Sequence, residues 1–137
     1  MEESICQIEI ESKGSNFVAR IASGMGGSRE LQSTRFEELL NQLINELHAE
    51  FQPDLIGVTA VEDTWPQARM LIKAVNDNPA PVIVGGVFPT LASDIPISHP
   101  DVDMICLGEG EHAIIELATK LMNGDDYSRI PNLWVKK

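Results

Sequence analysis

Glycine-rich turns follow two short apolar runs of the sequence. Val82-Ile83-Val84 is followed by Gly85 and Gly86, and the run 102–107 is followed by Gly108-Glu109-Gly110-Glu111. Because glycine has no Cβ, a flat or bulky molecule can approach such a backbone closely. Taken alone, the first pair is more simply a turn between a strand and a helix. A binding site becomes the better interpretation only if both turns meet in the fold.

Carboxylates lie in the same kind of loop. Glu62 follows the apolar run 55–58, and Glu109 and Glu111 follow the run 102–107. In one shared cleft these side chains could act as general acid and base. A carboxylate at the start of a helix is also stabilised by the helix dipole, and for Glu111 both interpretations stay open. No cysteine or serine elbow with a placed histidine supports covalent catalysis, so an enzyme acting alone is one hypothesis and a binding module is another.

A long amphipathic segment precedes these loops and predicts a helix over residues 34–51. Thr34 and Glu37 have the spacing of a capping box. Apolar residues then recur at helical spacing and form one stripe. His48 lies beside that stripe, where a histidine on the helix flank is a simpler interpretation than a metal ligand.

From residue 34 onward, helices and strands alternate. The sequence predicts helix, strand, helix, strand, short helix, strand and helix, with strands near 55–58, 82–84 and 103–107. This order favours an α/β fold with a parallel sheet and helices on both of its faces. Ligands of such sheets bind outside the carboxyl ends of the strands. The loops 59–62, 85–90 and 108–111 must then share one edge, and their convergence is the physical case for a ligand site.

The N-terminal part has a different pattern. Residues 5–11 and 17–22 have strand character, and the turn cluster 12–16 between them is too short for a crossover helix, so we expect a hairpin. The glycine-rich stretch 24–28 lacks a Walker lysine and reads as a loop rather than a phosphate site. Residues 1–33 are therefore expected to form N-terminal strands with a glycine-rich loop.

Composition limits the class of protein. The 137 residues suit one domain, and an apolar share of 43% with a charged share of 23% is ordinary for a globular protein. The net charge of −11 argues against nucleic acid and anionic membrane surfaces. Cys6 and Cys106 are too few for a metal cluster or a disulfide framework, so we expect a reduced, cytoplasmic setting. No stretch approaches the roughly 18 apolar residues of a membrane span, and the N-terminus lacks a signal-peptide core.

Several short stretches occur in an order and at a spacing that are fairly specific together. They are Pro53–Thr59, Val82–Gly86 with Thr90, Val102-Asp103, Gly108–Glu111 and Ile130–Leu133. With them the chain resembles, over about residues 34–135, the cobalamin-binding domain that precedes the catalytic domain in cobalamin-dependent radical S-adenosylmethionine enzymes. The resemblance implies a cobalamin-binding-like α/β domain at 34–129 and, at 130–137, a linker toward a catalytic domain that this chain does not contain.

The resemblance implies a flavodoxin-like, Rossmann-like sheet that grips a corrinoid. The glycine pair would lie against the nucleotide tail, the loop after Val58 under the corrin ring, and the turn at 108–111 would close the other side. The cofactor-binding residues that it implies are Thr59, Ala60, Val61, Glu62, Gly85, Gly86, Val87, Thr90, Gly108, Glu109 and Gly110.

The sequence departs from the family at its start. Family members normally open with a strand, a helix and a second strand, whereas residues 5–22 read as a hairpin. The N-terminal part is therefore expected to be atypical or truncated, with a sheet that is short of a strand or completed by another chain. Exposed sheet edges invite pairing, so we expect some tendency to form a homodimer.

The resemblance also bears on cobalt and on catalysis. None of His48, His99 and His112 lies in the Asp-x-His-x-x-Gly loop that supplies a lower axial histidine in the methionine-synthase type of domain. Cobalamin is thus expected to bind without a protein histidine on cobalt. The chain has no Cys-x-x-x-Cys-x-x-Cys run for an iron–sulfur cluster, so the expected partner is a radical S-adenosylmethionine domain, of methyltransferase or cyclase type, in cis or in trans. The alternative is a regulatory or interaction domain of the same fold that has lost the corrinoid.

Overall fold

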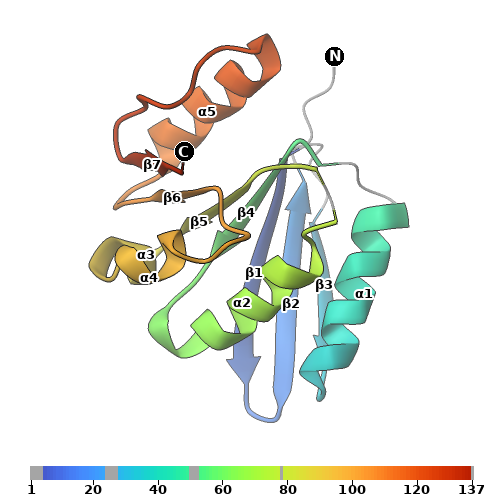
Figure 1. Ribbon diagram of the computed structural model, residues 1–137. Helices are drawn as coiled ribbons and strands as arrows, with labels where there is room; N and C mark the ends of the chain where they lie inside the picture. The colour runs from blue at the N-terminus through green and yellow to red at the C-terminus, as the bar shows by residue number, and fades with distance from the viewer. Residues whose placement is uncertain (1–4, 24–27, 50–52, 78, 137) are drawn as a thin grey trace.

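The structure is a computed structural model, and it describes residues 5–23, 28–49, 53–77 and 79–136 (Figure 1). The predicted loop at 24–27 lies outside the described residues. Within them the strands form one sheet in the order β3-β2-β1-β4-β5-β6-β7. The strands are β1 Ile5–Lys13, β2 Asn16–Ser23, β3 Ser28–Ser33, β4 Leu55–Thr59, β5 Val82–Gly85, β6 Met104–Cys106 and β7 Leu133–Val135.

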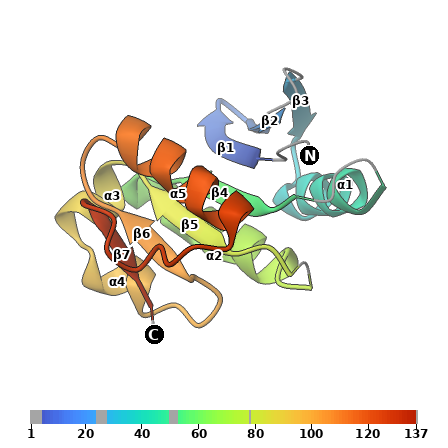
Figure 2. The same cartoon turned by 90° about the horizontal axis from the view of Figure 1, so that it is seen from above.

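Helices cover both faces of this sheet. The helices are α1 Phe36–Ala49, the 3-10 turn η1 Glu62–Thr64, α2 Trp65–Ala74, α3 Val87–Leu91, α4 Asp94–Ile97 and α5 Glu111–Asn123. Figures 1 and 2 show α1 and α2 together on one face and α5 on the other. The predicted α/β class with helices on both faces is confirmed.

The three apolar runs form the central strands. β4, β5 and β6 are parallel neighbours, with Ile56 opposite Val82 and Ile83 opposite Met104. Their side chains are almost all buried, as expected for parallel strands that are covered on both faces. The prediction of adjacent, buried, parallel strands near 55–58, 82–84 and 103–107 is therefore confirmed.

Two apolar clusters fill the space on the two faces. One includes Ile56 and Val84 of the sheet with residues of α1 and α2, and the other includes Leu55 and Ile83 with residues of α5. Successive strand residues point to opposite faces, so neighbours in β4 and β5 belong to different clusters. This alternation decides which strand residues can line a site under α5.

The predicted hairpin is also confirmed, but the sheet is not short of a strand. β1 pairs antiparallel with β2, with Lys13 opposite Asn16, and Gly14 in the turn has φ +59°. β1 also pairs parallel with β4, and Glu9 lies opposite Thr59. The expected gap beside the central strands is therefore filled by the chain itself, without a second chain.

A third N-terminal strand, β3, was not predicted. It pairs antiparallel with β2 and extends the sheet outward. Its sequence is mostly polar, and Leu31 is its only large apolar residue. The Leu31 side chain packs against the core under α1. Such an edge strand has no clear apolar alternation for sequence analysis to detect.

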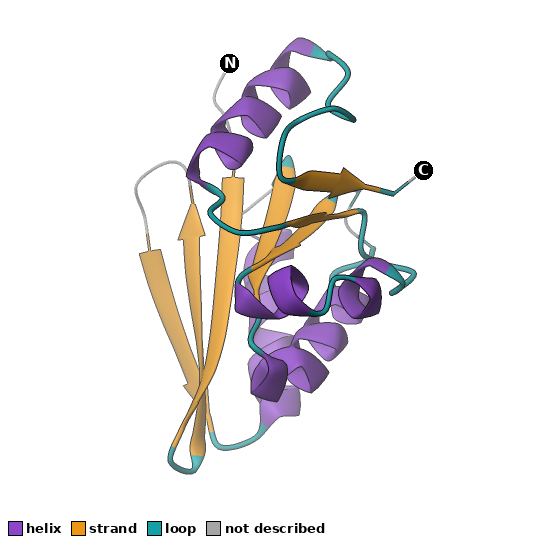
Figure 3. Ribbon diagram, turned by 90° about the vertical axis from the view of Figure 1, so that its left-hand side faces the viewer, coloured by secondary structure: helices purple, strands orange, loops and turns teal. Residues whose placement is uncertain are grey.

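The N-terminal strands carry an ion-pair network on the surface. The guanidinium of Arg20 lies 2.7 Å from a Glu11 carboxylate oxygen and 3.4 Å from one of Glu30. These residues come from three adjacent strands, which run side by side at the left of Figure 3. A polar strand surface can face water, so the hairpin does not need the helix that a parallel crossover would have placed there.

The C-terminal stretch joins the sheet. Leu133–Val135, part of the segment expected as a linker, pairs antiparallel with β6 as β7. Ile130 and Leu133 are buried in the cluster under α5. In the structure this stretch therefore packs with the domain.

Candidate functional site

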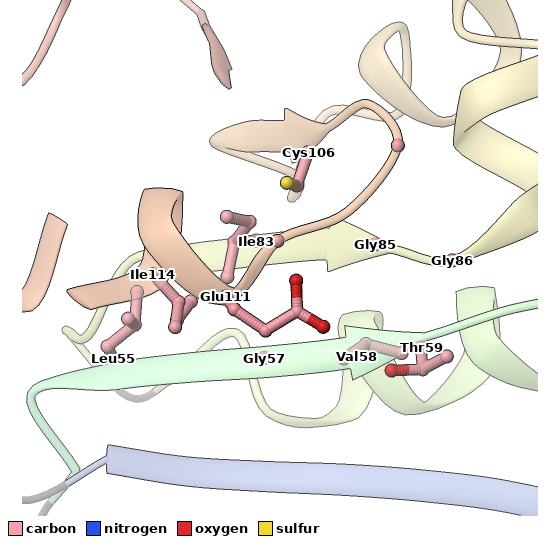
Figure 4. A pocket seen from close by; sticks show the side chains of 12 residues that line it. Leu55, Gly57, Val58, Thr59, Ile83, Gly85, Gly86, Cys106, Glu111 and Ile114 are labelled. Carbon is pink, nitrogen blue, oxygen red and sulfur yellow. The ribbon is translucent and has the colours of Figure 1, made fainter. Parts of the chain in front are cut away.

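The predicted loops meet at one edge of the sheet, next to a cavity. The cavity has a volume of about 400 Å³ and opens between the sheet and α5 (Figure 4). It is lined by Leu55, Gly57, Val58, Thr59, Ile83, Gly85, Gly86, Cys106, Gly108, Gly110, Glu111 and Ile114. The lining thus comes from β4, β5, β6 and the start of α5, as a site at the carboxyl ends of parallel strands requires.

Glycines keep this cavity open. A Cβ placed on Gly85 would lie 3.9 Å from the Cβ of Cys106, and one on Gly110 would lie 3.3 Å from the Cys106 sulfur. Gly85 has no positive φ, so its backbone would accept another residue without strain. The absence of a side chain at Gly85 is therefore better explained by the space that it leaves than by the turn.

Gly86 differs from Gly85 because the turn itself requires it. Its φ is +104°, and a Cβ there would lie 2.9 Å from the carbonyl oxygen of Ala60. That carbonyl accepts a hydrogen bond from the Phe88 N–H at 3.3 Å, and the Ala60 N–H donates to Gly85 at 3.1 Å. Gly85 therefore leaves space in the cavity, whereas Gly86 allows the backbone conformation of the turn.

Thr90 connects two of the loops. Its hydroxyl donates to the Gly86 carbonyl at 2.9 Å and accepts the Gly108 N–H at 2.9 Å. Thr90 does not line the cavity. It instead fixes the loop after β5 against the loop after β6, which makes it a positioning residue.

The predicted site residues fall into three groups. Thr59, Gly85, Gly86, Gly108 and Gly110 line the cavity. Ala60 is buried in the core cluster under α2. The residues exposed on the loops and short helices around the cavity are Val61, Glu62, Val87, Thr90 and Glu109.

More than half of the cavity lining was missed by sequence analysis. The lining residues absent from the predicted set are Leu55, Gly57, Val58, Ile83, Cys106, Glu111 and Ile114. Strand alternation places Leu55 and Gly57 on the same face as Thr59, and that signal was available once Thr59 was chosen. No comparable signal in the sequence indicated the position of α5 over this face.

Glu111 is the only charged side chain among the lining residues. Figure 4 shows its carboxylate extending from the start of α5 across the cavity toward Thr59. Burial raises the pKa of the nearby Cys106 thiol, and the charge of Glu111 raises it further. Both effects favour the protonated thiol form of Cys106.

Histidine does not contribute to the lining described here. His99 lies between α4 and β6, where its ring contacts Trp65 edge-on with centroids 6.2 Å apart. His112 is exposed on α5, and the side chain of His48 lies outside the described part. The described residues also contain no group of three or more His, Cys, Asp or Glu arranged to hold a metal ion.

Exposed apolar side chains lie beside the mouth of the cavity. Val61 is 46% exposed and Val87 60%. Val61 and Val87 flank the hydrogen bond between Phe88 and Ala60, so their loops are neighbours at the carboxyl edge. A ligand larger than the cavity could cover these side chains while part of it enters the cavity.

Comparison with known proteins identifies relatives of this fold and site. The model of a family described as B12 binding domain matches residues 12–118 of the sequence. Two solved structures of the radical S-adenosylmethionine methyltransferase TsrM from Kitasatospora setae are similar. One, with cobalamin and a 4Fe-4S cluster bound, has a TM-score of 0.61 and 27% identity over 67% of this chain. The other, with tryptophan and an S-adenosylmethionine analogue bound, has a TM-score of 0.56 and 27% identity over 72% of this chain.

The match covers a small part of those structures. This chain corresponds to 18% of one TsrM chain and 19% of the other. None of the curated proteins matches the sequence. Within the described residues, every helix is too short or too polar to span a membrane.

Proposed function

The chain belongs to the B12-binding domain family, and we propose that it is the corrinoid-holding module of a cobalamin-dependent radical S-adenosylmethionine enzyme. The observation that carries the proposal is the glycine-lined cavity at the carboxyl edge of the sheet. Gly85 and Gly110 leave space that a Cβ would fill, and neither has a positive φ that explains it. A cofactor whose flat tail lies against the backbone would explain why glycine occupies both positions.

The residues present fit a corrinoid. The cavity would take the nucleotide tail, and the apolar side chains of Val61 and Val87 would lie under or beside the corrin ring. When bound, the cofactor supplies a cobalt centre that can carry a methyl group. The part of this chain is to bind and orient the cofactor and to exclude water from its tail.

We further propose that cobalt has no histidine ligand from this chain. The support is that the residues lining the described cavity include no imidazole, and that His99 packs against Trp65 instead. Replacing each of His48, His99 and His112 by alanine should leave the visible spectrum of the loaded protein unchanged. A shift in the spectrum of any one variant would identify that histidine as an axial ligand.

The main experiment is a binding test. Hydroxocobalamin is added to the purified chain, the excess is removed on a desalting column, and the visible spectrum is recorded. We expect retained cobalamin in the parent protein and little in Gly85→Leu, because the added side chain fills the cavity without straining the backbone. Glu116→Leu is the control, since Glu116 is exposed on α5 and does not line the cavity.

The binding test also separates the two functional hypotheses. A parent protein that stays colourless while remaining folded would favour a regulatory or interaction domain that has lost the corrinoid. Equal binding by the parent and Gly85→Leu would show that the cavity does not hold the cofactor. A missing sheet strand would have favoured the regulatory hypothesis, but β1 occupies the place beside β4.

The proposed catalytic partner is a radical S-adenosylmethionine domain, in cis or in trans. Its support is that this chain corresponds to 18% of a chain of TsrM, a radical S-adenosylmethionine methyltransferase whose structure has a 4Fe-4S cluster bound. A reduced, cytoplasmic setting suits such a partner. Reading the complete gene tests the cis arrangement: a Cys-x-x-x-Cys-x-x-Cys run in the same reading frame supports it, and a stop codon after Lys137 would leave the trans arrangement.

A further inference from the structure

The hairpin of β1 and β2 extends beyond the edge of the sheet where the cavity opens. Glu9 of β1 lies opposite Thr59, the last residue of β4, and β1 continues through residues 10–13 with no partner residue in β4. At about 3.3 Å per residue, these residues span about 13 Å. We call residues 10–13 with their partners 16–19 in β2 the overhang. Figures 1 and 3 show it past the ends of the other parallel strands.

One face of the overhang is held against α1. The ring of Phe17 meets the ring of Phe36 edge-on with centroids 5.4 Å apart, and Ala19 is buried in the cluster under α1 and α2. On the other face, the Lys13 ammonium lies 3.4 Å from a Glu11 carboxylate oxygen. The overhang is therefore ordered before a ligand arrives, and a ligand that binds it loses little free energy to ordering the protein.

The second face of the overhang is on the same side of the sheet as the cavity. Residues opposite each other in neighbouring strands share a face, and Thr59 lines the cavity, so position 9 of β1 lies on the cavity side. Alternation then places Glu11 and Lys13 on that side, together with Asn16 opposite Lys13. Of the described helices only α5 lies on this side, and Figure 2 shows that it leaves β2 and β3 uncovered. This face is therefore open beside the mouth of the cavity.

The open face carries both donors and acceptors of hydrogen bonds. The Lys13 ammonium donates, the Glu11 carboxylate accepts, and the Asn16 amide does both. Beyond Glu9, β1 pairs with β2 on one side, and the described sheet has no strand on its other side. Peptide N–H and C=O groups that point to that side have no strand partner. These groups match a ligand that carries carboxamides, because a carboxamide both donates and accepts hydrogen bonds.

We propose that the overhang is a side wall for the corrin ring and binds the carboxamide groups on the rim of that ring. The inference rests on the proposed function, in which the cavity takes the nucleotide tail and the ring stays outside the mouth at Thr59 and Gly86. Figure 4 shows β1, in blue, continuing alongside β4 past Thr59. Because β1 also lies next to η1, the overhang flanks the space in front of the mouth.

The test compares cobalamin with cobinamide, which has the ring and its carboxamides but lacks the nucleotide tail. Kd values are measured from the change in the visible spectrum. In Lys13→Ala/Asn16→Ala we expect both Kd values to rise at least about fivefold and by the same factor, because contacts to the shared ring are lost. Gly85→Leu should weaken the binding of cobalamin but not of cobinamide, because its side chain fills the cavity.

Lys120→Ala/Asn123→Ala is the matched control. It removes the same two residue types from the last turn of α5, whereas the cavity is lined by residues at the start of that helix. Both Kd values should equal those of the parent protein. Circular dichroism melting establishes that each double variant is folded before its Kd values are compared.

Hydrogen exchange is a second measurement, and it needs no substitution. The backbone amides of residues 10–13 are followed in the free protein and with each corrinoid bound. We expect at least one of these amides to exchange at least about tenfold more slowly with either ligand, because a peptide group without a strand partner gains a hydrogen bond.

The outcomes separate the inference from the function on which it rests. If the parent protein binds neither corrinoid, the proposed function itself is wrong. If it binds cobalamin but not cobinamide, or if Lys13→Ala/Asn16→Ala keeps the Kd values of the parent, the overhang is not a wall for the ring. A variant weakened for cobalamin alone would place the overhang at the tail, which also overturns the inference. Unchanged exchange at residues 10–13 would do the same.

Discussion

Adjacent glycines in this protein are constrained by different forces. Gly85 has an ordinary φ and open space in front of it, whereas Gly86 has φ +104° and the Ala60 carbonyl in the place of a Cβ. The sequence Gly85-Gly86 alone does not separate a position that makes room for a ligand from one that makes a turn. Substitutions at the two positions should therefore affect different properties.

Gly86→Ala should lower the free energy of unfolding even without ligand. The new Cβ would lie 2.9 Å from the Ala60 oxygen in a backbone conformation that L-residues rarely adopt, and such strain costs about 1–3 kcal/mol. Gly85→Ala should change stability by less than about 1 kcal/mol, because its Cβ would make an ordinary contact with Cys106. Urea denaturation measures both. Equal effects in the two variants would contradict the distinction.

His99 should make the fold sensitive to acid. Burial lowers the pKa of His99, and the positive charges of Arg69, Lys136 and Lys73 lower it further, against the opposing charge of Asp101. A histidine with a lowered pKa in the folded state contributes stability above its unfolded pKa of about 6.5. That contribution is lost as the pH falls through the lower folded value.

The measurement compares the parent with His99→Gln from about pH 7 to about pH 5, across the ordinary range of histidine. The melting temperature of the parent should fall more steeply than that of the variant. If the two curves stay parallel, His99 has no lowered pKa in the folded protein.

At the scale of elements, β7 makes the C-terminal stretch part of the domain. Leu133 is 6% exposed under α5, and Trp134 beside it is 45% exposed. The backbone N–H of Lys136 donates to the Asp103 carbonyl at 2.8 Å, which continues the pairing with β6. β7 thus supports the strand whose end leads into Gly108 and Gly110.

Leu133→Ala should destabilise the protein by about 2–4 kcal/mol, because it removes buried methyl groups and leaves a cavity. Trp134→Ala should cost less than about 1 kcal/mol, since much of that ring already faces water. Thermal or urea unfolding checks the pair. A small effect of Leu133→Ala would mean that residues 130–137 act as a linker that does not pack with the domain in solution.

At the scale of the whole molecule, the N-terminal strands extend the sheet beyond β4. The described edge strand on that side is β3, which pairs only with β2 in the sheet order. Edge strands present unpaired backbone groups, although charged residues such as Glu30 on β3 oppose pairing. The expectation of self-association therefore stays, and β3 is the edge at which a second copy would pair.

We expect weak dimerisation that grows with protein concentration and is reduced by Gln32→Lys, which adds a charge to the exposed surface of β3. Sedimentation velocity over a wide concentration range measures this, and Met70→Lys, on the exposed surface of α2, is the control. A single monomeric species at the highest concentration would contradict the expectation.

The sequence by itself determined the parallel core and the place of the site. Three apolar runs separated by amphipathic helices leave few arrangements, because right-handed crossovers align the strands and bring their carboxyl ends to one edge. The loops at 59–62, 85–90 and 108–111 could therefore be placed together without coordinates. The hairpin also followed from local spacing, since a turn of a few residues excludes a crossover.

Tertiary structure alone decided the rest. Whether β1 or β2 would lie beside β4, and whether a polar segment such as Ser28–Ser33 would join as β3, depends on pairing between residues far apart in the chain. The inner lining by Leu55, Ile83 and Ile114 depends on which face α5 covers. Local periodicity specifies that a strand has two faces, but only the packing of distant elements determines which face encloses a cavity.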